Sequence, residues 1–472
     1  MKISYDLSDP LTLAMAPPAN ETPEERLVRE EKEERALEVS RRIDAEIKAA
    51  KIAMKKKRKT IKVLVLGQSL SGKSTTIKNF QMTYAQKSWA EERASWKAVV
   101  LLNLVRSINA IVDLVVEEVD IVNGKYTEDY EISHEGPSTS ISLTEDHKSI
   151  SLRLAPLRQI EKDLKSLLGS GTSEPDDKPE KYSSGRREPK SGFHEFALRS
   201  SSGWKSVLDH IRNPSEGKDQ ELHRVACHVV VSCKEYIKWL WNDSTVQKIL
   251  RKRQIRLEDT PGFFLNDIDR IVTMDYEPSD EDVVRARLRT TGVQEYHFTL
   301  DRGPSAALEW LMYDVAGTRT QRAAWIPYFK DITAIIFLAP LSAFNERLAE
   351  DHGINRLDDT LALWKTICAS ELLKSVQIIL FLNKTDILKR KIDAGVRVRD
   401  HLSEYGDRKN DFLTVSSWFR KYFAKVYKDV SPPGRTLNAH FTSVVDTKMT
   451  AQTLAAVQAV ILRNDIADAG LL

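Results

Sequence analysis

The sequence predicts an α/β fold in which a mostly parallel sheet is interrupted by a helical segment of about 200 residues. Three observations predict this fold. An apolar run at residues 60–67 ends in a glycine-rich loop that is followed by a helix-forming stretch. Helical signals then dominate as far as about residue 284. From Val293 onward, short apolar runs alternate with helical stretches, which is the pattern of a parallel sheet.

The first strand and its loop are written KTIKVLVLGQSLSGKSTT, and the helix-forming run IKNFQMTYA follows. The loop has the spacing Gly-x-x-x-x-Gly-Lys-Ser. Its glycines allow a tight turn whose backbone N–H groups point at phosphate oxygens, and the helix adds its positive dipole end. Lys73 can reach the outer phosphates, and the Ser74 hydroxyl can bind Mg²⁺. The residues that we expect at the phosphates are Gly67, Leu70, Ser71, Gly72, Lys73, Ser74 and Thr75. For this motif alone, a chance glycine-rich turn is the alternative.

The amino-acid composition limits the classes of protein to which this chain could belong. The 472 residues are 41% hydrophobic and 29% charged, with a net charge of +3, which does not favour a nucleic-acid-binding protein. Cys227, Cys233 and Cys368 have no spacing that indicates a disulfide framework or a metal site. The first 20 residues lack the pattern of a signal peptide, and no apolar run approaches the length of a membrane span. We therefore expect an intracellular protein.

The N-terminal region divides into two parts. Residues 1–22 contain proline and small residues without a sustained period, and we expect them to be disordered. Residues 23–59 are rich in Glu, Arg and Lys, with sparse leucine and isoleucine, which predicts a charged helix. Its end, KKKRK, is a basic cluster that could attract anionic lipid. A solvated helix that binds nothing is the alternative.

Residues 83–284 are expected to form a helical domain. Its segment WKAVVLLNLVRSINAIVDLVVEEV, residues 96–119, reads as the apolar helix of a bundle core. From about residue 133 to residue 203 the chain is rich in Ser, Gly, Pro and charge, and we expect a disordered insertion there. Helical signals return at residues 206–253.

Residues 60–82 and 285–472 are expected to form the α/β domain. Six apolar runs predict the strands of its sheet: KVLVLG, EYHFTL, ALEWLMYDV, TAIIFLAPL, VQIILFLNK and NAHFTSVV. Helical stretches separate the later runs, and TAQTLAAVQAVILRN is the last helix. This alternation predicts a mostly parallel sheet covered by helices.

Two further signals concern the phosphates and the metal. In the stretch RARLRTTG, residues 285–292, a hydroxyl can supply a second Mg²⁺ ligand and an arginine can neutralise charge on the transferring phosphoryl group. An ordinary basic connector is the alternative for this stretch alone. Asp314 closes an apolar strand and can hold Mg²⁺ through water, while the N–H of Gly317 can approach the γ-phosphate. We also expect nucleotide contacts from Asp259 and Arg285.

Two last signals concern the base. The run IILFL ends in Asn383, Lys384, a threonine and Asp386. An aspartate can accept both the ring N–H and the exocyclic amine of guanine, a pair that adenine does not offer. Ser443 and Val444 follow the last strand, where a backbone N–H could meet the guanine carbonyl. Together, the ordered signals predict a guanine-nucleotide-binding P-loop protein.

With these motifs in this order, the chain resembles the α subunits of heterotrimeric G proteins. The match runs from about residue 24 to residue 472, apart from the insertion. It includes the segments KEYIKWLWNDSTVQKILRKR, FFLNDIDRI, DVVRARLRTTGVQEYHF, DVAGTRTQRAAWIPYF, IIFLAPLSAFNERLAED, LFLNKTDIL and ADAGLL. The resemblance implies a Ras-like P-loop GTPase domain with an inserted all-helical domain that clasps the nucleotide, and an N-terminal helix.

The resemblance also implies residue roles and partners. Arg287 matches the family's catalytic arginine supplied in cis, Thr290 its Mg²⁺-binding threonine, and Gly317 its γ-phosphate-sensing glycine. Asn383, Lys384 and Asp386 match the guanine-reading motif. The implied ligands are GTP or GDP with Mg²⁺, and the implied partners are a βγ dimer, a seven-helix receptor and an effector.

Several positions depart from the family pattern. Thr318 stands where the family has its water-orienting glutamine, and its short hydroxyl side chain should position the attacking water poorly. Ser69 replaces a glycine of the phosphate loop, Leu70 replaces an acidic residue that pairs with a switch arginine, and Ala316 replaces a glycine of the second switch. The pair of alanines at positions 323–324 stands where the family usually has basic residues near its βγ contact.

Membrane attachment also departs from the family pattern. Residue 2 is lysine, and no cysteine precedes Cys227, so neither myristoylation nor N-terminal palmitoylation is expected. The basic cluster KKKRK could substitute electrostatically, which predicts peripheral, reversible contact at the cytoplasmic face of the plasma membrane.

The first functional hypothesis is a GTP-driven signal transducer with slow hydrolysis, acting downstream of a membrane receptor. The alternative is a GTP-dependent scaffold that essentially does not hydrolyse, which Thr318 and Ser69 would suit. A P-loop ATPase or kinase is the third hypothesis, and the guanine-reading motif from Asn383 to Asp386 argues against it.

Overall fold

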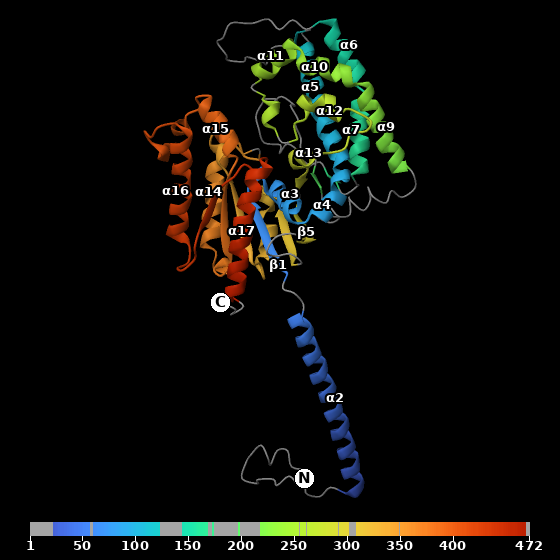
Figure 1. Ribbon diagram of the computed structural model, residues 1–472, viewed down its shortest axis with the longest axis vertical. Coiled ribbons are helices and arrows are strands. Elements are labelled where there is room, and N and C mark those ends of the chain that lie inside the picture. Colours follow the sequence, from blue (N-terminus) through green and yellow to red (C-terminus); the bar gives the residue numbers. More distant parts are fainter. Residues whose placement is uncertain are drawn as a thin grey trace, which may run out of the picture. The chain divides into compact units, whose positions relative to one another are not determined.

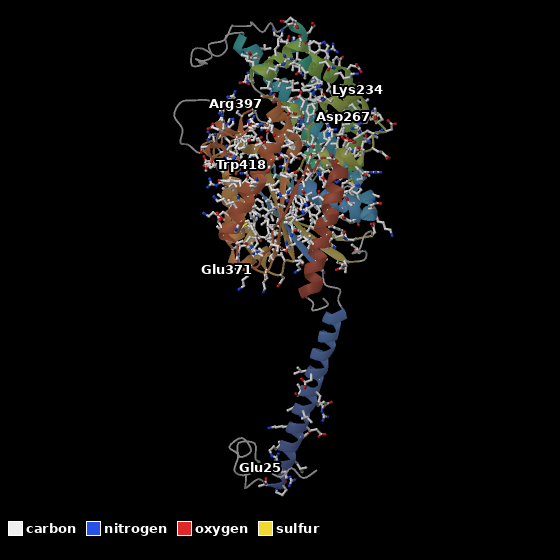
Figure 2. The ribbon with its side chains drawn as sticks, turned by 60° about the vertical axis from the view of Figure 1, so that its left-hand side comes forward. Glu25, Lys234, Asp267, Glu371, Arg397 and Trp418 are labelled. Atoms are coloured by element: carbon white, nitrogen blue, oxygen red, sulfur yellow. The ribbon has the colours of Figure 1, made fainter. Side chains whose placement is uncertain are left out.

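The computed structural model describes residues 22–56, 60–122, 144–168, 172–173, 197–198, 218–253, 255–260, 262–290, 292–301, 308–348 and 350–468. The chain divides into two compact units, Met1–Lys59 and Thr60–Leu472. In the first unit, α2 (Pro23–Lys56) is a charged helix whose described side chains are nearly all exposed; Glu25 lies near its start (Figure 2). Apart from Thr22, the residues for which we expect disorder at the N-terminus lie outside the described ones.

The second unit is built on a six-stranded sheet in the order β5-β6-β1-β7-β8-β9. Within this six-stranded sheet, the β5–β6 pair is antiparallel and the other four pairs are parallel. The strands are β1 (Ile61–Gly67), β5 (Val293–Thr299), β6 (Glu309–Val315), β7 (Ala334–Pro340), β8 (Gln377–Asn383) and β9 (Asn438–Phe441). The six predicted strands and the mostly parallel sheet are therefore confirmed.

Helices cover both faces of the sheet, which explains why its central strands are apolar along their whole length (Figure 1). Successive side chains of β1 point to opposite layers. Val63 and Val65 pack with α3 and α17, whereas Leu64 and Leu66 pack with α14, α15 and α16. These helices are α3 (Lys73–Tyr84), α14 (Arg356–Ala369), α15 (Thr385–Asp393), α16 (Phe412–Val430) and α17 (Thr447–Asp468).

The described residues between α3 and β5 are mainly helical and have their own apolar core. The helices of this region are α4 (Gln86–Arg93), α5 (Lys97–Val122), α6 (Glu145–Leu154), α7 (Leu157–Leu167), α9 (Lys218–Ser232), α10 (Lys234–Asn242), α11 (Ser244–Lys252), α12 (Ile268–Ile271) and α13 (Asp280–Arg285). Figure 1 shows them gathered around α5, in colours that run from blue and cyan through green to yellow. The predicted fold class, an α/β domain with an inserted helical domain, is confirmed.

One expectation about the apolar segments was wrong. Among the described residues, the helical stretch Gln86–Asp120 is long and apolar enough to cross a membrane by length and composition. However, 72% of its most apolar window is buried inside the structure, because α5 supplies the centre of the helical core. We interpret it as the core helix of the bundle.

The expected disordered insertion at about 133–203 was too broad. Residues 144–168 contain α6 and α7, which pack on α5. The apolar residues of α7 recur at helical spacing and are buried: Leu157, Ile160, Leu164 and Leu167. The surrounding Ser, Gly and Pro lowered the average hydrophobicity and concealed this local period.

One of two short strands from the insertion pairs with the segment that follows α13. The strand β3 (Ala197–Leu198) pairs antiparallel with β2 (Thr172–Ser173) and parallel with β4 (Arg289–Thr290). The insertion therefore contributes a backbone neighbour to the RARLRTTG stretch, a contact that the sequence did not predict.

Candidate nucleotide-binding site

A cavity of about 350 Å³ opens where the carboxyl ends of the parallel strands face the helical region. Ligands of open α/β sheets bind at this edge. Predicted site residues supply much of its lining: Leu70, Gly72, Ser74, Thr75, Arg285, Arg287, Lys384, Asp386, Ser443 and Val444. Residues that lie far apart in the sequence thus meet at one site.

The phosphate loop has the backbone that its glycines predict. Gly67 and Gly72 have φ of 145° and 103°, a region that favours glycine. A Cβ on Gly72 would lie 2.5 Å from the Asn383 side-chain nitrogen, so a side chain does not fit there. Leu70 also has a positive φ, 60°, which an L-residue adopts at a cost of about 1–2 kcal/mol. The loop therefore carries backbone strain at one of the positions that depart from the family pattern.

Lys73 lies beneath this loop. Its Nζ donates to the carbonyl oxygens of Gly67 at 3.0 Å and Gln68 at 2.8 Å. Burial lowers the pKa of Lys73 to about 8, although nearby Asp314 favours the charged form. The lysine is therefore poised to lose its proton near pH 8 unless a phosphate stabilises its charge.

This pKa predicts a pH-dependent affinity for GDP. Phosphate binds the protonated lysine, so affinity should fall about tenfold between pH 7 and pH 9 as Lys73 of the free protein loses its proton. Titration with a fluorescent GDP analogue measures this fall. Lys73→Arg, which stays charged, should bind more weakly but with a flat profile.

Unfolding does not explain such a fall. Between the folded pKa of about 8 and the ordinary value of 10.5, the unfolded chain binds more protons at Lys73 than the folded chain does. The contribution of this group to the free energy of unfolding therefore rises with pH over that interval. A GDP affinity that stays constant or increases from pH 7 to pH 9 would contradict the assignment.

Two of the predicted metal-site residues meet beside the loop. The Ser74 hydroxyl donates to Asp314 Oδ2 at 2.5 Å, and Asp314 is fully buried at the end of β6. A hydroxyl and a carboxylate beside a phosphate cradle are hard oxygen ligands, and they fit Mg²⁺. No group of three or more His, Cys, Asp or Glu that could bind a metal occurs in the described part of the chain. Thr290 lies in β4, and its side chain is outside those that the structure describes.

Hydrogen bonds with residues of the helical region hold the two predicted arginines in place. Asn103 of α5 accepts from the backbone N–H of Arg287 at 2.7 Å and donates to its carbonyl at 2.9 Å. This pair of hydrogen bonds sets the backbone of Arg287 at the cavity. Arg285 also lines the cavity, and its guanidinium donates to Phe263 O at 2.8 Å and Asp267 Oδ2 at 2.9 Å.

The guanine-reading residues form the other end of the cavity. Asn383 Nδ2 donates to the carbonyl of Ser71 at 2.7 Å, and its Oδ1 accepts from the Val444 N–H at 3.3 Å. Asn383 therefore joins the phosphate loop to the loop after β9. Asp386 Oδ1 accepts from the Ser443 hydroxyl at 2.8 Å. Lys384 has φ of 61°, and burial lowers its pKa to about 8.

The remaining predicted residues lie at the edges of the site. Gly317 packs on the phosphate loop, because a Cβ there would come within 2.3 Å of the Ser69 nitrogen. Thr318 is 8% exposed and directly precedes a 3₁₀ helix, η4 (Arg319–Phe329). Asp259 ends the short 3₁₀ helix η2 (Leu257–Asp259), and its side chain is outside the described ones.

Sequence reasoning missed several residues of the site. Asn103 is one, and a polar residue inside an apolar helix was the available signal. Lys78 is another: its Nζ donates to the carbonyls of Val283 and Ala286, and burial lowers its pKa to about 7. Gln294 and Tyr296 of β5 line the same part of the cavity. A period-two pattern on one strand did not distinguish them from ordinary core residues.

Comparison with known families agrees with this geometry. Residues 37–461 match the family model described as G-protein alpha subunit. The chain belongs to this family. The alpha subunit is 30% identical to the guanine nucleotide-binding protein alpha-4 subunit of Mycosarcoma maydis, over 99% of this chain and 96% of that protein.

Two further relatives have similar coverage. The alpha-1 subunit of Mycosarcoma maydis is 28% identical over 91% of this chain and 95% of its own length. The alpha-2 subunit of Neurospora crassa is 26% identical over 90% of this chain and 94% of its own length. As a member of this family, the alpha subunit is a guanine-nucleotide-binding signal transducer and GTPase that binds GDP and GTP. The predicted family is confirmed.

Proposed function

We propose that this alpha subunit hydrolyses GTP slowly because Thr318 occupies the position from which an attacking water is oriented. The observation that supports the proposal is the position of Gly317, packed on Ser69 of the phosphate loop, which brings the next residue to the edge of the γ-phosphate site. Thr318 offers one short hydroxyl. A longer amide would offer a donor and an acceptor on separate atoms, so the threonine should orient water less well.

Other residues of the predicted site supply the remaining functions of the reaction. The loop N–H groups and Lys73 bind the phosphates, and Arg287, set by Asn103, neutralises charge on the transferring group. Ser74 and Thr290 would hold Mg²⁺, with Asp314 acting through water. When bound, the ion supplies charge neutralisation at the β- and γ-phosphate oxygens. Asp386 accepts hydrogen bonds from guanine, and the Asn383 side chain keeps the two loops together.

The signalling role comes from the family, and its details are proposals for this chain. We place the alpha subunit in the cytoplasm, peripheral at the plasma membrane, where it couples a seven-helix receptor to an effector and binds a βγ dimer. Exposed, charged α2 and the basic cluster at its end support a peripheral membrane contact. Ala323 and Ala324 are exposed on η4, so the βγ contact there would lack basic side chains.

A GTP-dependent scaffold that does not turn over is the second candidate, favoured by Thr318 and Ser69 in the same site. Purified chain loaded with GTP distinguishes the two candidates. We expect GTP and GDP, but not ATP, to compete for a fluorescent GDP analogue, and bound GTP to convert to GDP slowly. Binding of GTP without any conversion to GDP would support the scaffold. Equal competition by ATP would contradict both candidate functions.

A further inference from the structure

Gln68 is a phosphate-loop residue whose side chain is directed away from the nucleotide cavity. It is 1% exposed and is not among the residues that line the cavity. Its amide spans the space between the loop and the start of α14. Nε2 donates to Asp359 Oδ2 at 2.6 Å and to the Arg356 carbonyl at 3.2 Å, while Oε1 accepts from Arg356 Nε at 3.2 Å. Both bonds that the amide nitrogen donates and the bond that its oxygen accepts are thus made with one helix.

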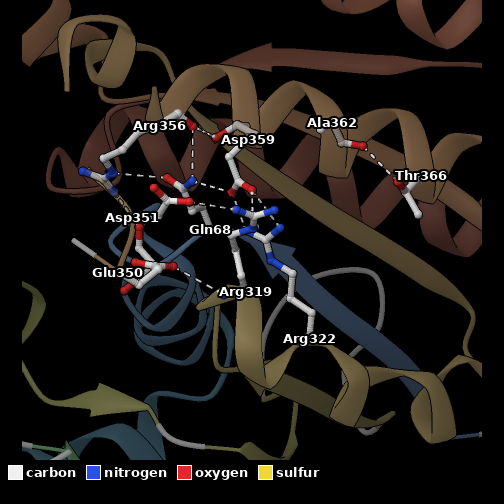
Figure 3. A network of polar contacts seen from close by, with 12 residues as sticks. Gln68, Arg319, Arg322, Glu350, Asp351, Arg356, Asp359, Ala362 and Thr366 are labelled. Carbon is white, nitrogen blue, oxygen red and sulfur yellow. Dashed lines mark hydrogen bonds and ion pairs between the residues drawn. The ribbon is translucent and has the colours of Figure 1, made fainter. Parts of the chain in front are cut away.

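Asp359 connects this amide to η4. Its carboxylate accepts from both terminal nitrogens of Arg322, a paired arrangement, and Arg319 Nε lies 3.6 Å from Oδ1. Figure 3 shows Gln68 and the two arginines converging on this single carboxylate. Burial opposes ionisation of Asp359, but hydrogen bonds from Arg322 and Gln68 prevail and lower its pKa. The carboxylate is charged, and both of its oxygens accept hydrogen bonds.

The backbone of Gln68 lies at the centre of the phosphate site. Its carbonyl accepts from Lys73 Nζ at 2.8 Å, and a Cβ on Gly317 would lie 2.7 Å from the same oxygen. Arg356 makes a second connection between α14 and the phosphate loop, since its Nη2 donates to the Ser69 carbonyl at 2.7 Å. One residue therefore contacts the phosphate-binding lysine, the glycine before Thr318, and the helix that holds the arginines of η4.

We propose that Gln68 is a positioning residue that couples the phosphate loop to η4 through Asp359, so that the arginines of η4 stay docked on α14 when the loop grips a nucleotide. The inference rests on the proposed guanine-nucleotide site. Gln68 orients the Asp359 carboxylate for paired acceptance from Arg322. Removing the amide leaves the ion pair in place but without the group that fixes its orientation relative to the loop.

Limited trypsin digestion tests this coupling directly, because trypsin cleaves after Arg319 and Arg322 when η4 leaves α14. The chain is loaded with GTPγS, and cleavage at these two sites is followed by mass spectrometry. Gln68→Glu keeps the size of the side chain but sets a carboxylate against Asp359 Oδ2, and Gln68→Ala removes the amide altogether. We expect cleavage at both sites to accelerate about five- to tenfold in each variant.

Two control experiments distinguish a positioning role of Gln68 from a general loss of structure in its variants. Gln81 is also a buried glutamine, donating to Glu92 Oε2 at 3.3 Å away from η4, and Gln81→Ala should leave cleavage at Arg319 and Arg322 unchanged. In an Asp359→Ala background, Gln68→Ala should add nothing, because its route to η4 has been removed. Full additivity, or wild-type cleavage in both Gln68 variants, would overturn the proposal.

GDP binding by the same samples distinguishes a failure of the proposed guanine-nucleotide site from a failure of the coupling through Gln68. Wild-type protein and the Gln81→Ala control should bind the fluorescent GDP analogue alike, because the loop N–H groups and Lys73 remain. Wild-type protein that binds no guanine nucleotide would refute the proposed function itself. Normal binding with unchanged cleavage would refute only the coupling through Gln68.

Discussion

Replacing Arg287 by alanine should lower the single-turnover rate of GTP hydrolysis by about 10³-fold or more, because arginines supplied in this way to phosphoryl transfer, in alpha subunits among others, are worth roughly 10³ to 10⁵ in rate. The guanidinium stabilises charge that develops only during transfer. GTP affinity should change little by comparison, since the loop and Lys73 carry ground-state binding. Rapid-quench measurement of phosphate release from preloaded protein gives the rate.

Matched variants establish that the effect belongs to the guanidinium at this position. Arg287→Lys keeps the charge but loses the planar fork, so most of the rate should still be lost. Arg289→Ala removes the same charge two residues along the chain and should have a small effect. Equal losses for the alanine variants at 287 and 289 would show that general positive potential, rather than a placed arginine, supports the reaction.

Replacing Asp386 by alanine should weaken GDP binding about 10²- to 10⁴-fold, because two hydrogen bonds from guanine to a charged acceptor are lost. Selectivity gives a sharper readout than affinity. Inosine nucleotides lack the exocyclic amine, so the wild-type preference for GDP over IDP should nearly vanish in Asp386→Ala. Competition against a fluorescent GDP analogue measures both quantities.

The control for this second prediction is Ser443→Ala. It removes the hydroxyl that donates to Asp386 at 2.8 Å but leaves the carboxylate. We expect a loss of less than about tenfold with the preference for GDP retained. If Ser443→Ala abolished the preference as completely as Asp386→Ala, then the structure of the loop, not the carboxylate, would govern recognition of the base.

Much of this site could be predicted from short motifs, because the chemistry of a nucleotide constrains residues that are close in sequence. The loop from Gly67 to Ser74 and the Asn383-to-Asp386 motif each follow a strand, and the register of a parallel sheet brings strand ends together. The pairing of β1 with both β6 and β7 places Asp314 beside Ser74. The six strands and the mostly parallel character of the sheet also followed from apolar runs, whereas the strand order came from the structure.

The contacts that join separate elements could not be predicted in the same way. Asn103 clamps Arg287 across 184 residues of sequence, and Gln68 reaches Asp359 across 291 residues. Each is a single polar residue within an ordinary pattern, and only the packing of two elements gives it a partner. The helices α6 and α7 were missed for a different reason, since polar neighbours masked a short apolar period.

The most direct test of slow hydrolysis is the single-turnover rate of Thr318→Gln compared with that of the wild-type chain. The glutamine amide can donate to and accept from the attacking water, whereas the threonine hydroxyl is too short to do both. We predict that Thr318→Gln hydrolyses bound GTP about ten- to a hundredfold faster, with GTP affinity unchanged within a few-fold. An unchanged rate would contradict the account, because Thr318 would then not limit the reaction.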